Sequence, residues 1–77
     1  MTKPKVSSAK WYKMWEQDDA VCYYDENDYF FLKLVIPNQR VKYFYGEMAH
    51  TDAARFAGDN GYQELWYWIN EIGRAHV

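Results

Sequence analysis

The chain has 77 residues, of which 49% are hydrophobic and 21% are aromatic, and its formal net charge is −2. This length indicates one domain, and the single cysteine, Cys22, excludes an internal disulfide and a cysteine-based zinc site. The small negative charge argues against general affinity for nucleic acid, because neutralising phosphates needs a surplus of lysine and arginine.

The first residues give no sign of a folded element or of an export signal. We expect residues 1–6 to form a disordered tail and residues 7–77 to form a single α+β domain. No apolar run follows the N-terminal lysines, and the longest apolar run, "LVI", is too short to cross a membrane. The sequence therefore predicts no membrane contact and a reducing, cytoplasmic location.

The segment around residues 11–15 fits two structures. Ser7 or Ser8 is a suitable N-cap, and Trp11, Met14 and Trp15 then share one face of a short helix. A strand competes with this interpretation, because Trp11, Lys13 and Trp15 also alternate. We expect the helix, because Met14 joins the two tryptophans only at helical spacing.

Three strands are expected next, in the order "AVCYY" at 20–24, "YFFLKLVI" at 29–36 and "RVKYFY" at 40–45. The four-residue turns "DEND" and "PNQR" separate them, so the strands form a three-stranded antiparallel meander. Two helices follow: a short one over 50–58, with Thr51 as its N-cap and Gly58 past its end, and a longer one over 62–73 that Gly73 closes. The apolar stripe of the longer helix consists of Tyr62, Leu65, Trp66, Ile69 and Ile72. The fold class is α+β, with the C-terminal helix packed on one face of the sheet and short flanking helices.

Four-residue turns fix a strand register, and the register sorts the side chains onto two faces. The first face, expected to lie under the C-terminal helix, holds Val21, Tyr23, Phe30, Leu32, Leu34, Ile36, Val41, Tyr43 and Tyr45. The second face mixes aromatic residues with two lysines: Cys22, Tyr24, Tyr29, Phe31, Lys33, Val35, Lys42 and Phe44. Either this second face is a thinner core layer, or it is exposed and binds a partner, for which a second copy in a homodimer is one candidate.

Catalysis and metal binding have little support in the sequence. His76 lies beside the chain end, and His50 lies at an expected strand-to-helix junction, where a lone histidine is more often a surface residue or a local capping partner than a general base. Cys22 lies within an expected strand and has no neighbouring base to activate it. The acidic run "EQDDAVCYYDEND" lacks the glycine and distal glutamate of a calcium loop, and turn formation explains its aspartates. The sequence therefore predicts no enzyme, no metal and no cofactor.

The sequence favours a small non-catalytic module that binds a protein. Its size, acidity and aromatic content are typical of the proteins with which phages and mobile elements inhibit host enzymes, such as anti-restriction or anti-CRISPR proteins. The residues expected to bind the partner form an acidic rim and the second face: Asp18, Asp19, Tyr24, Asp25, Glu26, Asp28, Tyr29, Phe31, Lys33, Lys42 and Phe44. The alternative is a module that stacks single-stranded nucleic acid on the same aromatic face.

Overall fold

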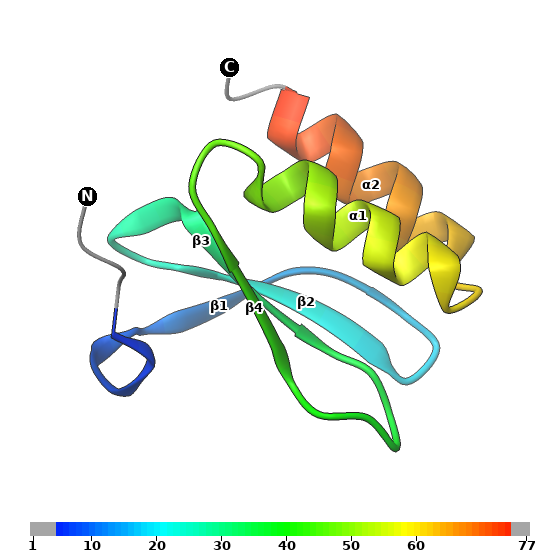
Figure 1. Ribbon diagram of the computed structural model, residues 1–77, viewed down its shortest axis with the longest axis horizontal. Coiled ribbons are helices and arrows are strands. Elements are labelled where there is room, and N and C mark those ends of the chain that lie inside the picture. Colours follow the sequence, from blue (N-terminus) through cyan, green and yellow to red (C-terminus); the bar gives the residue numbers. More distant parts are fainter. Residues whose placement is uncertain (1–4, 75–77) are drawn as a thin grey trace.

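The computed structural model describes residues 5–74, which form an antiparallel sheet and two α-helices (Figure 1). The α+β class predicted from the sequence is confirmed. The elements are η1 (Val6–Ser8), β1 (Trp11–Gln17), β2 (Ala20–Asp25), β3 (Asp28–Val35), β4 (Lys42–Tyr45), α1 (Ala49–Asp59) and α2 (Gln63–Arg74). The sheet has four strands in the order β1-β2-β3-β4, so the meander contains one strand more than predicted.

The molecule has two layers, because both α-helices lie on the same face of the sheet. Helix α1 packs on β3 and β4, and α2 packs against α1 and on β1 and β2. The core between the layers is one cluster of buried residues: Ala20, Cys22, Leu32, Leu34, Ile36, Ala49, Ala53, Ala54, Ala57, Leu65 and Ile69. Four alanines of α1 let that helix approach the sheet and α2 closely.

The helix predicted around residues 11–15 is wrong, because this segment is strand β1. The ladder between β1 and β2 pairs Lys13 with Tyr23 and then Trp15 with Cys22, so Met14 is an extra, bulged residue. A bulge reverses the alternation of side chains along a strand. Met14 and Trp15 consequently pack on the core, while Trp11 lies on the other face. The helical spacing that suggested a helix is therefore the result of the bulge.

The predicted register is also wrong on both sides of β3. Cys22 pairs with Leu34 rather than with Phe31, and Leu34 pairs with Lys42 rather than with Tyr43. The β2–β3 register changes at an irregularity next to the turn, where Asp25 pairs with Asp28 but Tyr24 pairs with Leu32. The second loop is longer than expected, because β3 ends at Val35 and β4 begins at Lys42. The pairing of β2 with β3 and that of β3 with β4 are each displaced by an odd number of residues. The side chains of β2 and β4 therefore lie on the face opposite to the one predicted.

Both predicted helices exist, although three of their expected ends differ. Gly58, expected past the end of the first helix, lies within α1, which continues to Asp59. Helix α1 begins after Met48, two residues before Thr51, and no side chain caps it. Gly73 lies within α2 rather than after it. A Cβ atom at this position would lie 2.5 Å from Cβ of His50, so Gly73 is required where α2 crosses the first turn of α1.

The tail predicted over residues 1–6 falls partly outside the described residues, which begin at Lys5. Lys5 and Val6 are exposed, and Val6 begins the short helix η1. His76 also lies outside the described part of the chain.

Candidate functional site

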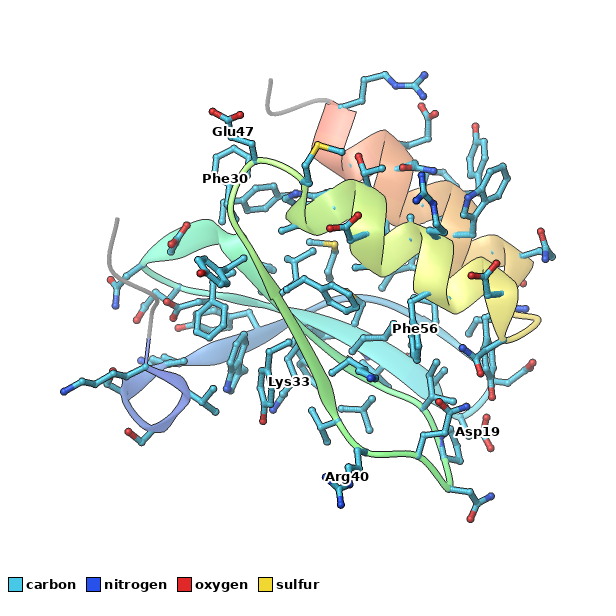
Figure 2. The ribbon with its side chains drawn as sticks, in the orientation of Figure 1. Asp19, Phe30, Lys33, Arg40, Glu47 and Phe56 are labelled. Atoms are coloured by element: carbon cyan, nitrogen blue, oxygen red, sulfur yellow. The ribbon has the colours of Figure 1, made fainter. Side chains whose placement is uncertain are left out.

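The face of the sheet turned away from the helices is the strongest candidate for a functional surface. Side chains alternate along a strand, so the neighbours of the core residues Leu32 and Leu34 in β3 point away from the helices. Figure 2 shows Lys33 on this side, whereas Phe56 of α1 lies on the core side against Phe44. We name this surface the open face and define it by Trp11, Val21, Tyr23, Phe31, Lys33, Val35, Tyr43 and Tyr45.

Phe31 is the centre of the open face. Its side chain is fully buried, although it does not belong to the core cluster beneath the helices. The Trp11 ring lies over it at a centroid distance of 4.9 Å, and the Tyr43 ring lies 6.4 Å from it. The Trp11 and Tyr43 rings are 6.0 Å apart. Part of this face thus forms a small second core, one of the two arrangements that the sequence left open.

The outer part of the same face stays in contact with solvent. Tyr43 is 40% exposed and Tyr45 is 44% exposed, and both lie on the edge strand β4. Val41, just before this strand, is 40% exposed. The open face therefore consists of aromatic rings packed around Phe31 and an exposed margin along β4.

Lys33 gives the open face its charge. It pairs with Tyr23 on one side and with Tyr43 on the other. Its Nζ atom lies 5.0 Å from the Trp11 ring centroid and 4.7 Å from that of Tyr23, both within cation–π range. No carboxylate of residues 5–74 lies within ion-pair distance of this ammonium group. Lys33 is thus a half-buried lysine among aromatic rings.

The lysine of β1, Lys13, is neutralised by an ion pair. Lys13 Nζ lies 2.8 Å from Oε1 of Glu16. This hydrogen bond raises the pKa of the Lys13 ammonium group. Lys13 and Glu16 pair with Tyr23 and Val21 and so lie on the β1 side of the open face, to which they add no net charge.

The acidic residues expected to bind a partner do not form one rim. Asp18 and Asp19 make the turn between β1 and β2. The other three acidic residues, Asp25, Glu26 and Asp28, lie at the far end of β2, roughly 20 Å away for a strand of this length.

Asp18 adopts a positive φ of 54°, which aspartate tolerates better than most residues. Asp19 accepts a hydrogen bond from the Tyr62 hydroxyl group at 3.1 Å. Burial, followed by this hydrogen bond, raises the pKa of Tyr62.

The carboxylates at the other end of β2 also make local contacts. Asp25 is buried and accepts the backbone N–H of Lys10 at 3.1 Å, while Asp28 accepts that of Phe30 at 2.9 Å. Glu26 accepts a hydrogen bond from the Tyr12 hydroxyl group and lies 3.9 Å from Lys10 Nζ. The contacts of Asp25 and Glu26 hold the β2–β3 turn against the start of β1, whereas the contact of Asp28 stays within β3.

The aromatic and basic residues of the predicted site are divided between the two faces. Phe31 and Lys33 lie on the open face, as expected. Tyr24 and Phe44 pack against the core beneath the helices, and Lys42 lies over the Phe56 ring of α1. Tyr29 stacks on His50, with ring centroids 4.9 Å apart.

Sequence reasoning missed Trp11, Tyr23, Tyr43 and Tyr45 as members of the same surface as Lys33. The predicted alternation of side chains within β2 and within β4 is correct. Because the register differs by an odd number of residues, however, the side chains of these two strands that were predicted beside Leu32 and Leu34 lie beside Phe31 and Lys33 instead. Trp11 was missed because its segment was assigned to a helix. The signal that would have found it is the alternation of Trp11 and Lys13.

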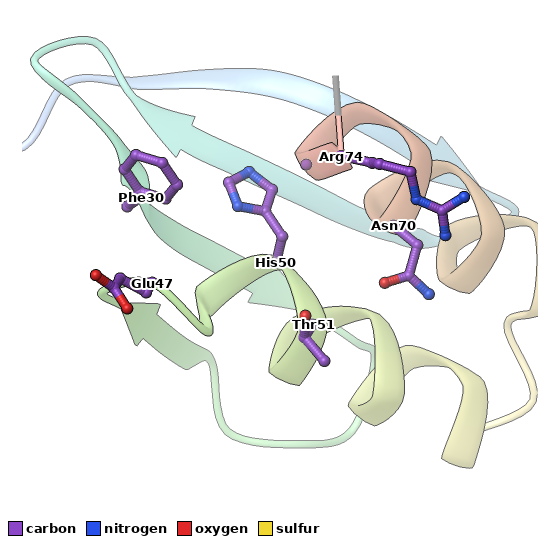
Figure 3. A pocket seen from close by; sticks show the side chains of 7 residues that line it. Phe30, Glu47, His50, Thr51, Asn70 and Arg74 are labelled. Carbon is purple, nitrogen blue, oxygen red and sulfur yellow. The ribbon is translucent and has the colours of Figure 1, made fainter. Parts of the chain in front are cut away.

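A small cleft lies at the other side of the molecule, where α1 begins and α2 ends (Figure 3). Its volume is about 240 Å³ and its lining is Phe30, Glu47, His50, Thr51, Asn70, Gly73 and Arg74. His50 is only 6% exposed, and its ring stands edge-on to Phe30. Arg74 is ion-paired with Glu71 at 3.4 Å. The cleft is smaller than the roughly 300 Å³ at which small-molecule pockets begin.

Within residues 5–74, the single cysteine is buried and no metal-binding cluster is present. Burial raises the pKa of the Cys22 thiol to about 12, so this residue stays protonated and unreactive at neutral pH. Among residues 5–74, no three side chains of histidine, cysteine, aspartate or glutamate converge as a metal site would need. Within the same residues, neither helix is long and apolar enough to span a membrane.

Comparison with known proteins gives no match: no protein-family model, no curated sequence and no solved structure is significantly similar to this chain. The functional argument therefore depends on the geometry of the open face.

Proposed function

We propose that the chain is a non-catalytic protein-binding module and that its partner docks on the open face. The observation that carries this proposal is the exposed pair Tyr43 and Tyr45, which borders the buried Phe31 on the side of the sheet opposite both α-helices. Tyrosine and tryptophan dominate the binding energy of many protein interfaces, because they bury a large area and lose little conformational entropy.

The open face is organised before any partner arrives. Its side chains are held by the backbone ladder of four strands, and Trp11 and Tyr43 are fixed further by contact with Phe31. A surface that is already ordered loses little entropy on binding, which favours affinity. A module of this kind acts by occupying a surface of its partner. Inhibition of a host enzyme, the role expected from the sequence, is the form of this function that we propose.

A second candidate function is the binding of single-stranded nucleic acid. Lys33 among aromatic rings supports it, since such proteins combine stacking platforms with basic residues. Two observations make it the weaker candidate. Phe31 is covered and offers no ring to a base, and acidic residues flank the face at both ends of β2, where they repel a phosphate chain.

The proposal is tested by affinity capture from an extract of the native host, with matched pairs of substitutions. Tyr43→Ala with Tyr45→Ala truncates the open face, and Trp66→Ala with Tyr67→Ala truncates an equally exposed aromatic pair on α2. A partner of the open face is captured by the wild type and by the α2 variant but not by the open-face variant. Equal capture by both variants contradicts the proposal, and recovery of nuclease-sensitive material supports the second candidate.

A further inference from the structure

We infer that the protein partner presents a carboxylate to Lys33, set among apolar side chains that cover the rings of the open face. This inference rests on the proposed function and specifies the chemistry of the partner. The observation behind it is a lysine at the centre of the open face, surrounded by aromatic side chains and without an ion-pair partner among residues 5–74.

Any interface formed on the open face includes Lys33. It lies on β3, an inner strand of the sheet, with Tyr23 and Tyr43 directly beside it on the neighbouring strands. Its ammonium group lies above Trp11 and Tyr23 rather than beyond the edge of the sheet. A partner that contacts Tyr43 and the Trp11 ring therefore also covers Lys33.

Covering Lys33 removes the water that solvates its charge. Aromatic rings offset only part of this loss, because cation–π attraction is weaker than the hydration of an ammonium ion. A buried charge without a counter-charge weakens an interface strongly. Docking on the open face thus requires an anionic group near Nζ of Lys33.

The described chain has no carboxylate to spare for this purpose. Glu16 is hydrogen-bonded to Lys13 at 2.8 Å. Asp25, the acidic residue of β2, is buried and accepts the backbone N–H of Lys10. The counter-charge must therefore come from the partner.

The open face argues against a second copy of this chain as the occupant. A symmetric face-to-face dimer places equivalent residues opposite each other around its two-fold axis. With the axis near the centre of the face, Lys33 of one copy approaches Lys33 of the other, and two like charges would be desolvated together. The homodimer that the sequence left open is disfavoured for this reason.

A carboxylate also fits better than a run of phosphates. Asp18 and Asp19 lie beyond one end of β2, and Glu26 and Asp28 lie beyond the other. A single carboxylate at the centre is attracted by Lys33 and stays away from both acidic ends. A nucleic-acid strand that follows β2 meets one end or both.

A displayed library of a small β-sandwich scaffold with randomised loops tests this inference. Wild-type protein and the Lys33→Glu variant are used as separate targets, after circular dichroism confirms that both are folded. Binders that lose affinity for Tyr43→Ala are kept as open-face binders. We expect those from the wild type to carry Asp or Glu in the contacting loop, and those from Lys33→Glu to carry Lys or Arg at that place. Exchanging this acidic residue for its amide should weaken binding by roughly tenfold or more, as for other close interfacial charge pairs.

The possible results separate this inference from the proposed function. Open-face binders without acidic enrichment, which bind Lys33→Met as well as the wild type, overturn the inference and leave the proposed function standing. A selection in which no binder depends on Tyr43 contradicts the proposed function itself. Sedimentation at micromolar concentration measures whether the chain dimerises. Dimerisation that becomes stronger in Lys33→Met supports the charge argument. Dimerisation that Tyr43→Ala abolishes and Lys33→Met leaves unchanged overturns it. Tight binding of a ten-residue oligothymidine that depends on Lys33 also overturns it, in favour of a phosphate partner.

Discussion

Gln17 and Leu65 are joined by a hydrogen bond across 48 positions of the sequence: the side-chain oxygen of Gln17 accepts the backbone N–H of Leu65 at 3.1 Å. The same oxygen accepts the N–H of Glu64 at 2.9 Å. The first N–H groups of a helix have no partner within the helix, so the last residue of β1 acts as the cap of α2. This contact ties the beginning of the sheet to the C-terminal helix.

Gln17→Ala should lower the free energy of unfolding by about 1 kcal/mol, as the loss of an N-cap does elsewhere. Gln17→Glu is the matched control, because it keeps the accepting oxygen and places a negative charge at the N-terminus of a helix, where charge of that sign is favourable. Urea denaturation of the two variants measures the difference. Equal destabilisation by both changes would show that the accepting oxygen has no role in stability.

Leu65→Ala should lower the free energy of unfolding by roughly 2–5 kcal/mol, because it removes a fully buried side chain from the core cluster between the sheet and the helices. Tyr67→Ala on the same helix removes a side chain that is 50% exposed and should cost much less. Chemical denaturation of both variants tests the docking of α2. An unchanged midpoint for Leu65→Ala would mean that the helix is not packed on the sheet as described.

Gly73→Ala should destabilise the protein by about 1–3 kcal/mol, although alanine favours helices over glycine by about 1 kcal/mol. The reason is the contact between α2 and α1, where a new Cβ would meet Cβ of His50 at 2.5 Å. Gly58→Ala is the control within α1, since its Cβ would meet the Trp66 side chain at 3.2 Å and this side chain is 43% exposed. In thermal unfolding, the midpoint temperature of Gly73→Ala should be well below that of Gly58→Ala. The opposite order would contradict the close crossing of the helices.

The stability of the protein should fall as pH rises above about 9, because of Cys22. Burial raises the pKa of its thiol from 9.0 to about 12 in the folded protein. Between these values the unfolded chain loses the thiol proton while the folded chain keeps it, so alkaline pH favours unfolding. The slope contributed by one such group is at most about 1.4 kcal/mol per pH unit.

Cys22→Ala removes this contribution and should flatten the pH profile between pH 9 and 10. Tyr29 and Tyr62, whose pKa values are also raised chiefly by burial, add their effect mainly above that range. The comparison uses the slopes of the two profiles, since the substitution also changes the packing of a buried residue. Parallel profiles for the wild type and Cys22→Ala would contradict the burial of the thiol.

The sequence predicts the central strand and the last helix well. The alternation in "YFFLKLVI" assigns Leu32, Leu34 and Ile36 to the core and Phe31 and Lys33 to the other face, as the structure has them. The helical spacing of Leu65 and Ile69 likewise identifies the buried side of α2, although Trp66, which was predicted on the same stripe, is 43% exposed. In both segments the pattern is long and is produced by one regular element.

The candidate site could not be predicted in full, because it depends on how the strands are aligned. The loop between β3 and β4 contains Asn38 at a positive φ of 66° and is longer than the four residues expected from "PNQR". A one-residue change in this loop decides whether Tyr43 lies beside Leu34 or beside Lys33. Nothing in the local pattern of residues 37–41 sets that length. The bulge at Met14 hid Trp11 for a similar reason, because an inserted residue changes the spacing on which pattern reading depends.

The central claim is that a protein docks on the open face, and site-specific photocrosslinking in the native host tests it most directly. A benzophenone amino acid replaces Tyr43 in one variant and Tyr67 in the other, since both side chains are exposed but only Tyr43 lies on the open face. The account predicts one discrete protein adduct from position 43 and none from position 67. An adduct from position 67 alone, or nucleic acid as the species crosslinked at position 43, would contradict it.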